Sequence, residues 1–206
     1  TRVQAGFLAQ DPVTGHVLAW VGSRDFAQDP FDHVQAARRQ PGSTFKPFVY
    51  GAAFANGATP EDTLMDTAVE IPLGGGRVWR PTDGGPPSDQ PMTLADGLAL
   101  SKNTITAQVM QQVGPARVAE VARALGVRQS KLEEVPSLAL GTSPVTLKEM
   151  ISAYSSIVNL GRYVEPVLIT SIEDRNGKVL ETFAKPVPEE VFQPRAAQTL
   201  RNTMRG

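Results

Sequence analysis

A serine and a lysine three residues apart, Ser43 and Lys46, stand at the predicted start of a helix. Pro41 and Gly42 suit the turn into this helix, and Gly57 follows its last apolar residue. Because positions i and i+3 share one helix face, the Lys46 ammonium group can reach the Ser43 hydroxyl. A serine attacks a carbonyl when an adjacent base takes its proton, and lysine serves as that base once burial or a nearby cation lowers its pKa. The pair therefore predicts a serine nucleophile with a lysine base.

The helix that must position this pair is predicted from apolar residues that recur at helical spacing after Ser43 over about four turns. Its N-terminal end would direct the positive end of the helix dipole toward the serine, which favours negative charge on the nucleophile and on a substrate oxyanion. Taken alone, Ser-x-x-Lys also describes a surface lysine near a helix start. A second polar cluster is needed to distinguish a catalytic pair from such a surface lysine.

Ser101, Lys102 and Asn103 form such a cluster, between two helices predicted at residues 94–100 and 104–113. Thr93 is the expected N-cap of the first helix. At a corner between helices, Ser101 and Asn103 can both project into one cleft while Lys102 points elsewhere. Read alone, Asn103 is also a plausible cap for the helix that follows it.

Residues 38–48, Arg-Arg-Gln-Pro-Gly-Ser-Thr-Phe-Lys-Pro-Phe, resemble the first motif of penicillin-binding proteins, in particular the transpeptidase domain of the bifunctional class A enzymes. Ser101-Lys102-Asn103 is similar to their second motif, Ser-x-Asn. The resemblance implies that Ser43, with Lys46 as base, is acylated by the D-alanyl-D-alanine end of a peptidoglycan stem peptide and equally by β-lactams. It further implies that Ser101 relays a proton to the leaving amine and that the Asn103 amide binds the substrate's peptide.

The other predicted elements are of the α+β class. Hairpins are expected at residues 3–21 and 168–183, helices at 115–125 and 194–205, and a capping box at residues 146–149 starts a helix that ends near residue 159. We expect the apolar stripe of this last helix to be core: Leu147, Met150, Ile151, Tyr154 and Ile157. The resemblance implies a penicillin-binding-protein and serine β-lactamase-like fold, with a helical lobe and an incomplete antiparallel sheet.

The third motif of the family, Lys-Thr/Ser-Gly, occurs nowhere in the sequence. Residues 1–206 are therefore interpreted as a partial transpeptidase domain, without the upstream glycosyltransferase domain and the downstream strand that carries this motif. That strand would supply a cation for the substrate carboxylate and an oxyanion-hole N–H, whose loss typically costs about a hundred- to a thousandfold in rate. We expect the fragment to be inactive or weakly active, and its unpaired sheet edge to favour a strand-mediated dimer or a complementing fragment.

The composition excludes several classes of function. A net charge of −1 gives no basic field for nucleic acid, and the absence of cysteine excludes thiol catalysis and Cys-based metal sites. His16 and His33 lack companion ligands at metal spacing, so neither a metal nor a cofactor is expected. The resemblance implies a periplasmic location at the extracytoplasmic face of the bacterial inner membrane, with anchoring only through the missing N-terminal part.

Two other functions remain open. A serine β-lactamase or a D,D-carboxypeptidase would resolve the acyl-enzyme with water instead of an amine, although no glutamate can be assigned to that task from the sequence. A non-catalytic β-lactam-sensing domain of the same fold is supported only by the missing third motif.

Overall fold

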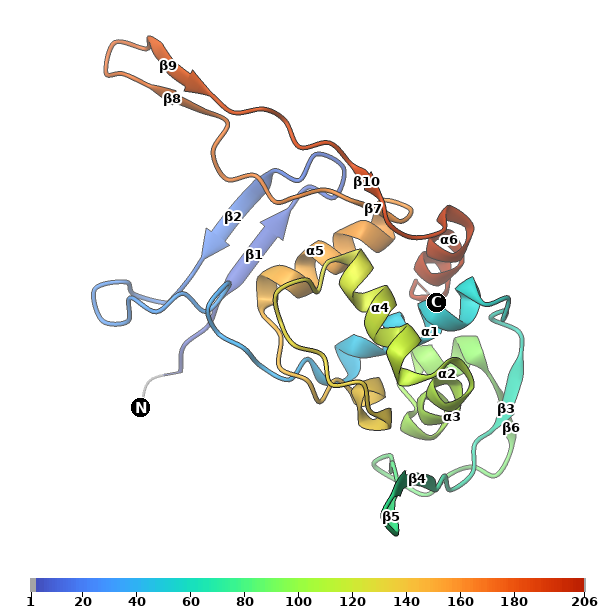
Figure 1. Cartoon of the computed structure of the whole chain (residues 1–206). Coiled ribbons are helices and arrows are strands. Elements are labelled where there is room, and N and C mark those ends of the chain that lie inside the picture. The colour runs from blue at the N-terminus through green and yellow to red at the C-terminus, as the bar shows by residue number, and fades with distance from the viewer. Residues whose placement is uncertain (1–2, 206) are drawn as a thin grey trace.

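The computed structural model describes residues 3–205, and helix α1 (Lys46–Ala55) lies at the centre of its helical lobe (Figure 1). A 3-10 turn, η1 (Gly42–Phe45), leads into α1, so the predicted helix begins as a tighter turn and becomes α-helical at Lys46. Residues 46–54 are all buried. A helix that is enclosed on all sides carries few polar groups, which makes Lys46 conspicuous.

Four helices pack around α1: α2 (Leu94–Ala99), α3 (Asn103–Val113), α4 (Pro115–Leu125) and α6 (Pro194–Thr203). The shared core contains Phe45, Phe48, Ile105, Met110 and Leu200, all fully buried. Burial of each such side chain stabilises the fold by about 1.5–3 kcal/mol. The core thus holds the start of α1 against the helices that carry the second polar cluster.

The helix ends follow the local signals in the sequence. Thr93 accepts a hydrogen bond from the Asp96 backbone N–H at 3.0 Å and so caps α2, as predicted. Thr146 and Glu149 form a complete capping box at the start of α5 (Leu147–Val158). These caps satisfy backbone N–H groups that have no partner within their helices.

The predicted hairpins are confirmed: β1 (Phe7–Gln10) pairs with β2 (Val17–Val21), and β8 (Ser171–Glu173) pairs with β9 (Val179–Thr182). Hairpin β8–β9 projects away from the helices (Figure 1). The other antiparallel pairs are β3 (Thr63–Met65) with β6 (Pro91–Thr93), β4 (Ile71–Gly74) with β5 (Arg77–Trp79), and β7 (Arg162–Tyr163) with β10 (Glu189–Glu190). Every sheet within residues 3–205 has two strands, so the α+β class and the incomplete sheet are both observed.

Hairpin β1–β2 lies beside α5, and a second 3-10 turn, η2 (Pro136–Leu140), packs against η1 and α3. No helix within the described residues is long and apolar enough to span a membrane.

Candidate active site

Lys46 is the buried cation of the site, with 1% of its surface exposed. Its Nζ donates hydrogen bonds to Ser101 Oγ at 3.0 Å, to Asn103 Oδ1 at 2.7 Å and to the Ser101 carbonyl oxygen. All three acceptors come from the corner between α2 and α3, more than fifty residues along the chain. The tertiary fold therefore joins the two polar clusters that the sequence analysis singled out.

The shape of this corner explains which side chains face Lys46. Ser101 has a φ of +54°, in the left-handed region, and its backbone N–H still bonds back to the Leu98 carbonyl. The chain then enters α3 at Asn103. Ser101 and Asn103 consequently face Lys46 while Lys102 points toward other groups, as predicted.

Asn103 does not serve as a helix cap. Lys102 occupies the N-cap position of α3, and no side-chain capping hydrogen bond is formed there. The Asn103 side chain instead bonds Lys46 through Oδ1 and the Thr82 carbonyl through Nδ2. The capping interpretation of this residue is therefore wrong.

Ser43 lies in the turn η1 with an exposed side chain, at a pocket of about 340 Å³. The pocket is lined by residues from three parts of the chain: Ser43, Lys46, Pro47, Leu98, Ala99, Ser101, and, at and just after the end of α6, Thr203, Met204 and Arg205. Three of the four predicted site residues thus share one pocket, and Asn103 contacts Lys46 beside it. Among the described residues, no hydrogen bond joins the Ser43 hydroxyl to Lys46.

The turn that carries Ser43 is held from two sides. The Gly42 backbone N–H donates to the Gly141 carbonyl at 3.3 Å, and the Tyr154 hydroxyl donates to the Thr44 carbonyl at 2.7 Å. Helix α5 and turn η2 therefore position the serine from outside α1.

The environment of Lys46 makes it a stronger candidate base than an exposed lysine. Burial lowers the pKa of Lys46 from 10.5 to about 8, although the nearby negative charge of Asp83 acts in the opposite direction. At a pKa of about 8, roughly a tenth of the side chain is neutral at pH 7, against less than about a thousandth at the ordinary value. Only the neutral amine can accept a proton from a serine hydroxyl.

Sequence reasoning missed the groups that surround the corner. Asp83 Oδ2 lies 3.2 Å from Lys102 Nζ, and Asp83 Oδ1 accepts the Asn103 backbone N–H at 2.7 Å. Both Thr82 and Asp83 belong to a glycine- and proline-rich excursion between Asp66 and Gln90. No local pattern marks them, because their partners are about twenty residues away.

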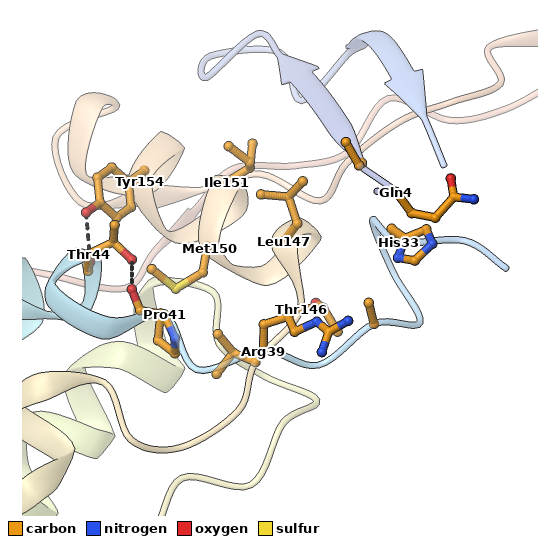
Figure 2. Close-up of a pocket in the computed structure, with 14 residues that line it drawn as sticks. Gln4, His33, Arg39, Pro41, Thr44, Thr146, Leu147, Met150, Ile151 and Tyr154 are labelled. Carbon is orange, nitrogen blue, oxygen red and sulfur yellow. Dashed lines mark hydrogen bonds between the residues drawn. The ribbon is translucent and has the colours of Figure 1, made fainter. Parts of the chain in front are cut away.

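A larger groove of about 770 Å³ lies between α5 and the segment 4–6 that leads into β1 (Figure 2). It includes Pro41 and Thr44 but none of the four predicted site residues. Leu147, Ile151 and Tyr154 line it and are only half-buried. The prediction that the whole stripe of α5 is core is therefore wrong for Leu147 and Ile151, whereas Tyr154 packs against the core beside Phe48.

No group of three or more His, Asp or Glu side chains in residues 3–205 is arranged to hold a metal ion. The polar groups that contact Lys46 are one hydroxyl, one backbone carbonyl and one carboxamide. They suit proton transfer and hydrogen bonding.

Comparison with known proteins identifies relatives across almost the whole chain. Residues 5–206 match the family model described as the penicillin-binding protein transpeptidase domain. Penicillin-binding protein 2D of Bacillus subtilis is 36% identical over 99% of this chain and 30% of its own length. The chain thus spans less than a third of that relative.

Solved structures agree. The crystal structure of penicillin-binding protein 1A from Haemophilus influenzae superposes with a TM-score of 0.88 and 26% identity, over 97% of this chain and 34% of that one. The PonA1 protein of Mycobacterium tuberculosis in complex with penicillin V superposes with a TM-score of 0.82 and 22% identity, over 98% of this chain and 56% of that one. At that identity the second likeness shows the fold alone.

Proposed function

Because this chain belongs to the family of penicillin-binding protein transpeptidase domains, we propose that it carries the acylation site of a class A peptidoglycan D,D-transpeptidase. Ser43 Oγ attacks the carbonyl of the penultimate D-alanine as Lys46 takes the hydroxyl proton. The bond to the terminal D-alanine then breaks, and its nitrogen leaves with a proton relayed through Ser101. An amine of a neighbouring stem peptide attacks the acyl-enzyme, forms the cross-link and releases Ser43.

One observation carries this proposal: a buried lysine whose pKa is lowered to about 8 joins Ser101 and Asn103 beside an exposed serine. A lysine in this state can take a proton from one side and pass it to the Ser101 hydroxyl on the other. Asn103 Oδ1 accepts from Lys46 and one Nδ2 hydrogen bonds the Thr82 carbonyl, so the second Nδ2 hydrogen provides the donor for the substrate peptide.

The proposed partners follow from this chemistry. They are stem peptides that end in D-alanyl-D-alanine, and β-lactams, whose strained amide presents a similar carbonyl. The penicillin V complex of the M. tuberculosis protein of the same fold supports the second class. Such substrates lie outside the cytoplasm, so we place the site at the extracytoplasmic face of the inner membrane.

We also propose that residues 1–206 by themselves acylate slowly, since they contain no Lys-Thr/Ser-Gly motif to bind the substrate carboxylate. Hairpin β1–β2 is a two-stranded sheet, extended within the described residues by a bridge between His16 and Val167. A two-stranded sheet is marginally stable, so we propose that its edge pairs with a further strand, from a second copy or from another polypeptide segment.

Labelling with a fluorescent penicillin tests the assignment of the nucleophile. The full-length protein should acquire a covalent adduct on the peptide that contains Ser43, and Ser43→Ala should abolish it. Ser137→Ala is a matched control, because the Ser137 hydroxyl bonds only Thr142 in the described chain. A protein that forms no adduct, or an adduct that survives Ser43→Ala, would refute the proposal.

The lifetime of the adduct separates this function from hydrolytic ones. Hydrolysis in seconds requires a base that activates water, and no Asp or Glu is among the residues that line the 340 Å³ pocket. We therefore expect the penicilloyl adduct to persist for minutes or longer. Turnover within seconds would favour a serine β-lactamase, and an inert Ser43 would favour a non-catalytic domain.

A further inference from the structure

Behind the corner that carries Ser101 and Asn103, Lys102 contacts two carboxylates. Its Nζ lies 3.0 Å from Asp66 Oδ2 and 3.2 Å from Asp83 Oδ2. The Lys102 and Asp83 side chains are 16% and 15% exposed, and that of Asp66 is 1% exposed. An ion pair withdrawn from solvent in this way is screened little by salt and requires well-placed partners.

Asp66 closes the base of the excursion between residues 66 and 90. Its Oδ2 accepts the backbone N–H and the hydroxyl of Ser88, both at 2.9 Å, and its Oδ1 accepts the Thr104 hydroxyl at 2.6 Å. Burial alone would raise the pKa of Asp66, but the hydrogen bonds from Thr104, Ser88 and Lys102 together hold it well below its usual value. Asp66 is therefore a fixed anion on which Lys102 is anchored.

The far part of the same excursion reaches Asn103. Asp83 Oδ1 accepts the Asn103 backbone N–H at 2.7 Å, and the Thr82 carbonyl accepts Asn103 Nδ2 at 2.8 Å. The Thr82 carbonyl can only accept and the Lys46 ammonium group can only donate. The Asn103 carboxamide must therefore turn Nδ2 toward Thr82 and Oδ1 toward Lys46. The orientation of the Asn103 carboxamide thus depends on where residues 82 and 83 are held.

We propose that Lys102, Asp66 and Asp83 form a clamp that positions Asn103 for the acylation reaction by holding residues 82 and 83 against the corner. The clamp residues touch neither Ser43 nor the pocket, so Lys102 and Asp83 are positioning residues. This inference rests on the proposed function, because it assigns them a role in that reaction.

The clamp also sets the charge near Lys46. Asp83 is the charge that acts on the pKa of Lys46, Lys102 is the ion-pair partner of Asp83, and Arg205 lines the same pocket as Lys46. Removal of the Asp83 charge should lower the pKa of Lys46, whereas removal of the Lys102 charge should raise it. Opposite shifts would show that the charges of the clamp act on Lys46, and the positioning of Asn103 is measured separately.

The test uses the full-length protein and three variants: Asp83→Asn, Lys102→Met and the control Arg123→Met. Arg123 pairs with Glu134 on the surface, where both side chains are more than 40% exposed. The rate constant for acylation of Ser43 by a fluorescent penicillin is measured from pH 6 to pH 10. The rise of this rate constant with pH should shift down by about 0.5–1 pH unit in Asp83→Asn and up by a similar amount in Lys102→Met.

The acylation rate constant on the plateau at high pH, where Lys46 is neutral in every variant, reports the positioning of Asn103 separately from the charge near Lys46. Lys102→Met should lower the plateau by about tenfold or more, because the Asn103 carboxamide loses its fixed orientation. Asp83→Asn keeps an oxygen for the Asn103 N–H but loses the ion pair with Lys102, so it should lower the plateau by less than Lys102→Met does. Arg123→Met should match the wild type in both respects.

Hydrogen exchange followed by mass spectrometry supplies a readout that is independent of activity. Exchange of residues 80–90 and of the Asn103 amide should be about tenfold faster or more in Lys102→Met and unchanged in Arg123→Met. Unchanged exchange, or pH profiles that shift in the same direction, would overturn the clamp. If Lys102→Met does not fold, the pH profile of acylation in Asp83→Asn tests the clamp instead. If the wild type forms no penicilloyl adduct, the proposed function is wrong, and the clamp is then tested by hydrogen exchange alone.

Discussion

Gly141→Ala should slow acylation without touching any residue of the pocket. Gly141 follows η2 with a φ of +66° and a ψ of 43°, the left-handed conformation, which costs a residue with a Cβ about 1–2 kcal/mol. A Cβ there would lie 2.6 Å from the Gly42 nitrogen and closer still to its carbonyl oxygen, whereas real Cβ contacts essentially never fall below 3.0 Å. The turn before Ser43 must therefore shift by several tenths of an ångström.

This shift gives the size of the effect. Displacement of a reacting group by about 1 Å costs about a hundredfold in rate, so we expect acylation of Ser43 to fall by about ten- to a hundredfold. Stability should fall by at least the backbone cost of 1–2 kcal/mol, equivalent to about 2–8 °C in melting temperature for a chain of this size.

Gly177→Ala is the matched control. Gly177 has a φ of +82° in the β8–β9 hairpin, and a Cβ added there would have no heavy atom within 4 Å except those of its chain neighbours. It should lose a similar backbone contribution to stability and acylate at the wild-type rate. The measurements are thermal unfolding and the rate constant for a fluorescent penicillin. If Gly141→Ala acylates as fast as Gly177→Ala, the contact between Gly141 and Gly42 does not position the serine.

Three further outcomes are expected. In the wild type, acylation should rise about tenfold per pH unit below pH 8 and level off above it, because only neutral Lys46 accepts a proton; a flat profile from pH 6 to 9 would contradict its role as base. Glu149→Gln should cost about 2–4 kcal/mol in urea unfolding, because the buried carboxylate accepts bonds from Ser130 and Thr146. Burial acts to raise the pKa of Glu149, but these hydrogen bonds hold it below 4.5. The stabilisation of the fold by this carboxylate should therefore be present above pH 4.5 and lost as the pH falls through the lowered pKa. If the wild type and Glu149→Gln lose stability equally in acid, this reasoning is refuted. Thr93→Ala should cost about 1 kcal/mol, checked by the same unfolding, and no change would mean that the cap on α2 is not needed.

Local signals predicted much of the fold. The Thr93 cap and the Thr146 and Glu149 capping box each depend on residues within four positions of one another, and both are found where the sequence predicts them, as is the hairpin within residues 168–183. The apolar stripe of α5 shows the limit of such patterns. Periodicity identifies the face of a helix that avoids water, but it does not identify which neighbour covers each part of that face.

The same division holds in the candidate site. The sequence by itself determined the types and order of the site residues: Ser43 and Lys46 at a helix start, then Ser101 and Asn103 at a corner. Only the tertiary structure decided that Lys46 bonds the corner and not Ser43, and that Asp66 and Asp83 hold Lys102 behind it. The physical reason is range: a helical turn relates residues three or four apart, whereas these contacts join groups that are tens of residues apart in sequence and meet only when the core packs.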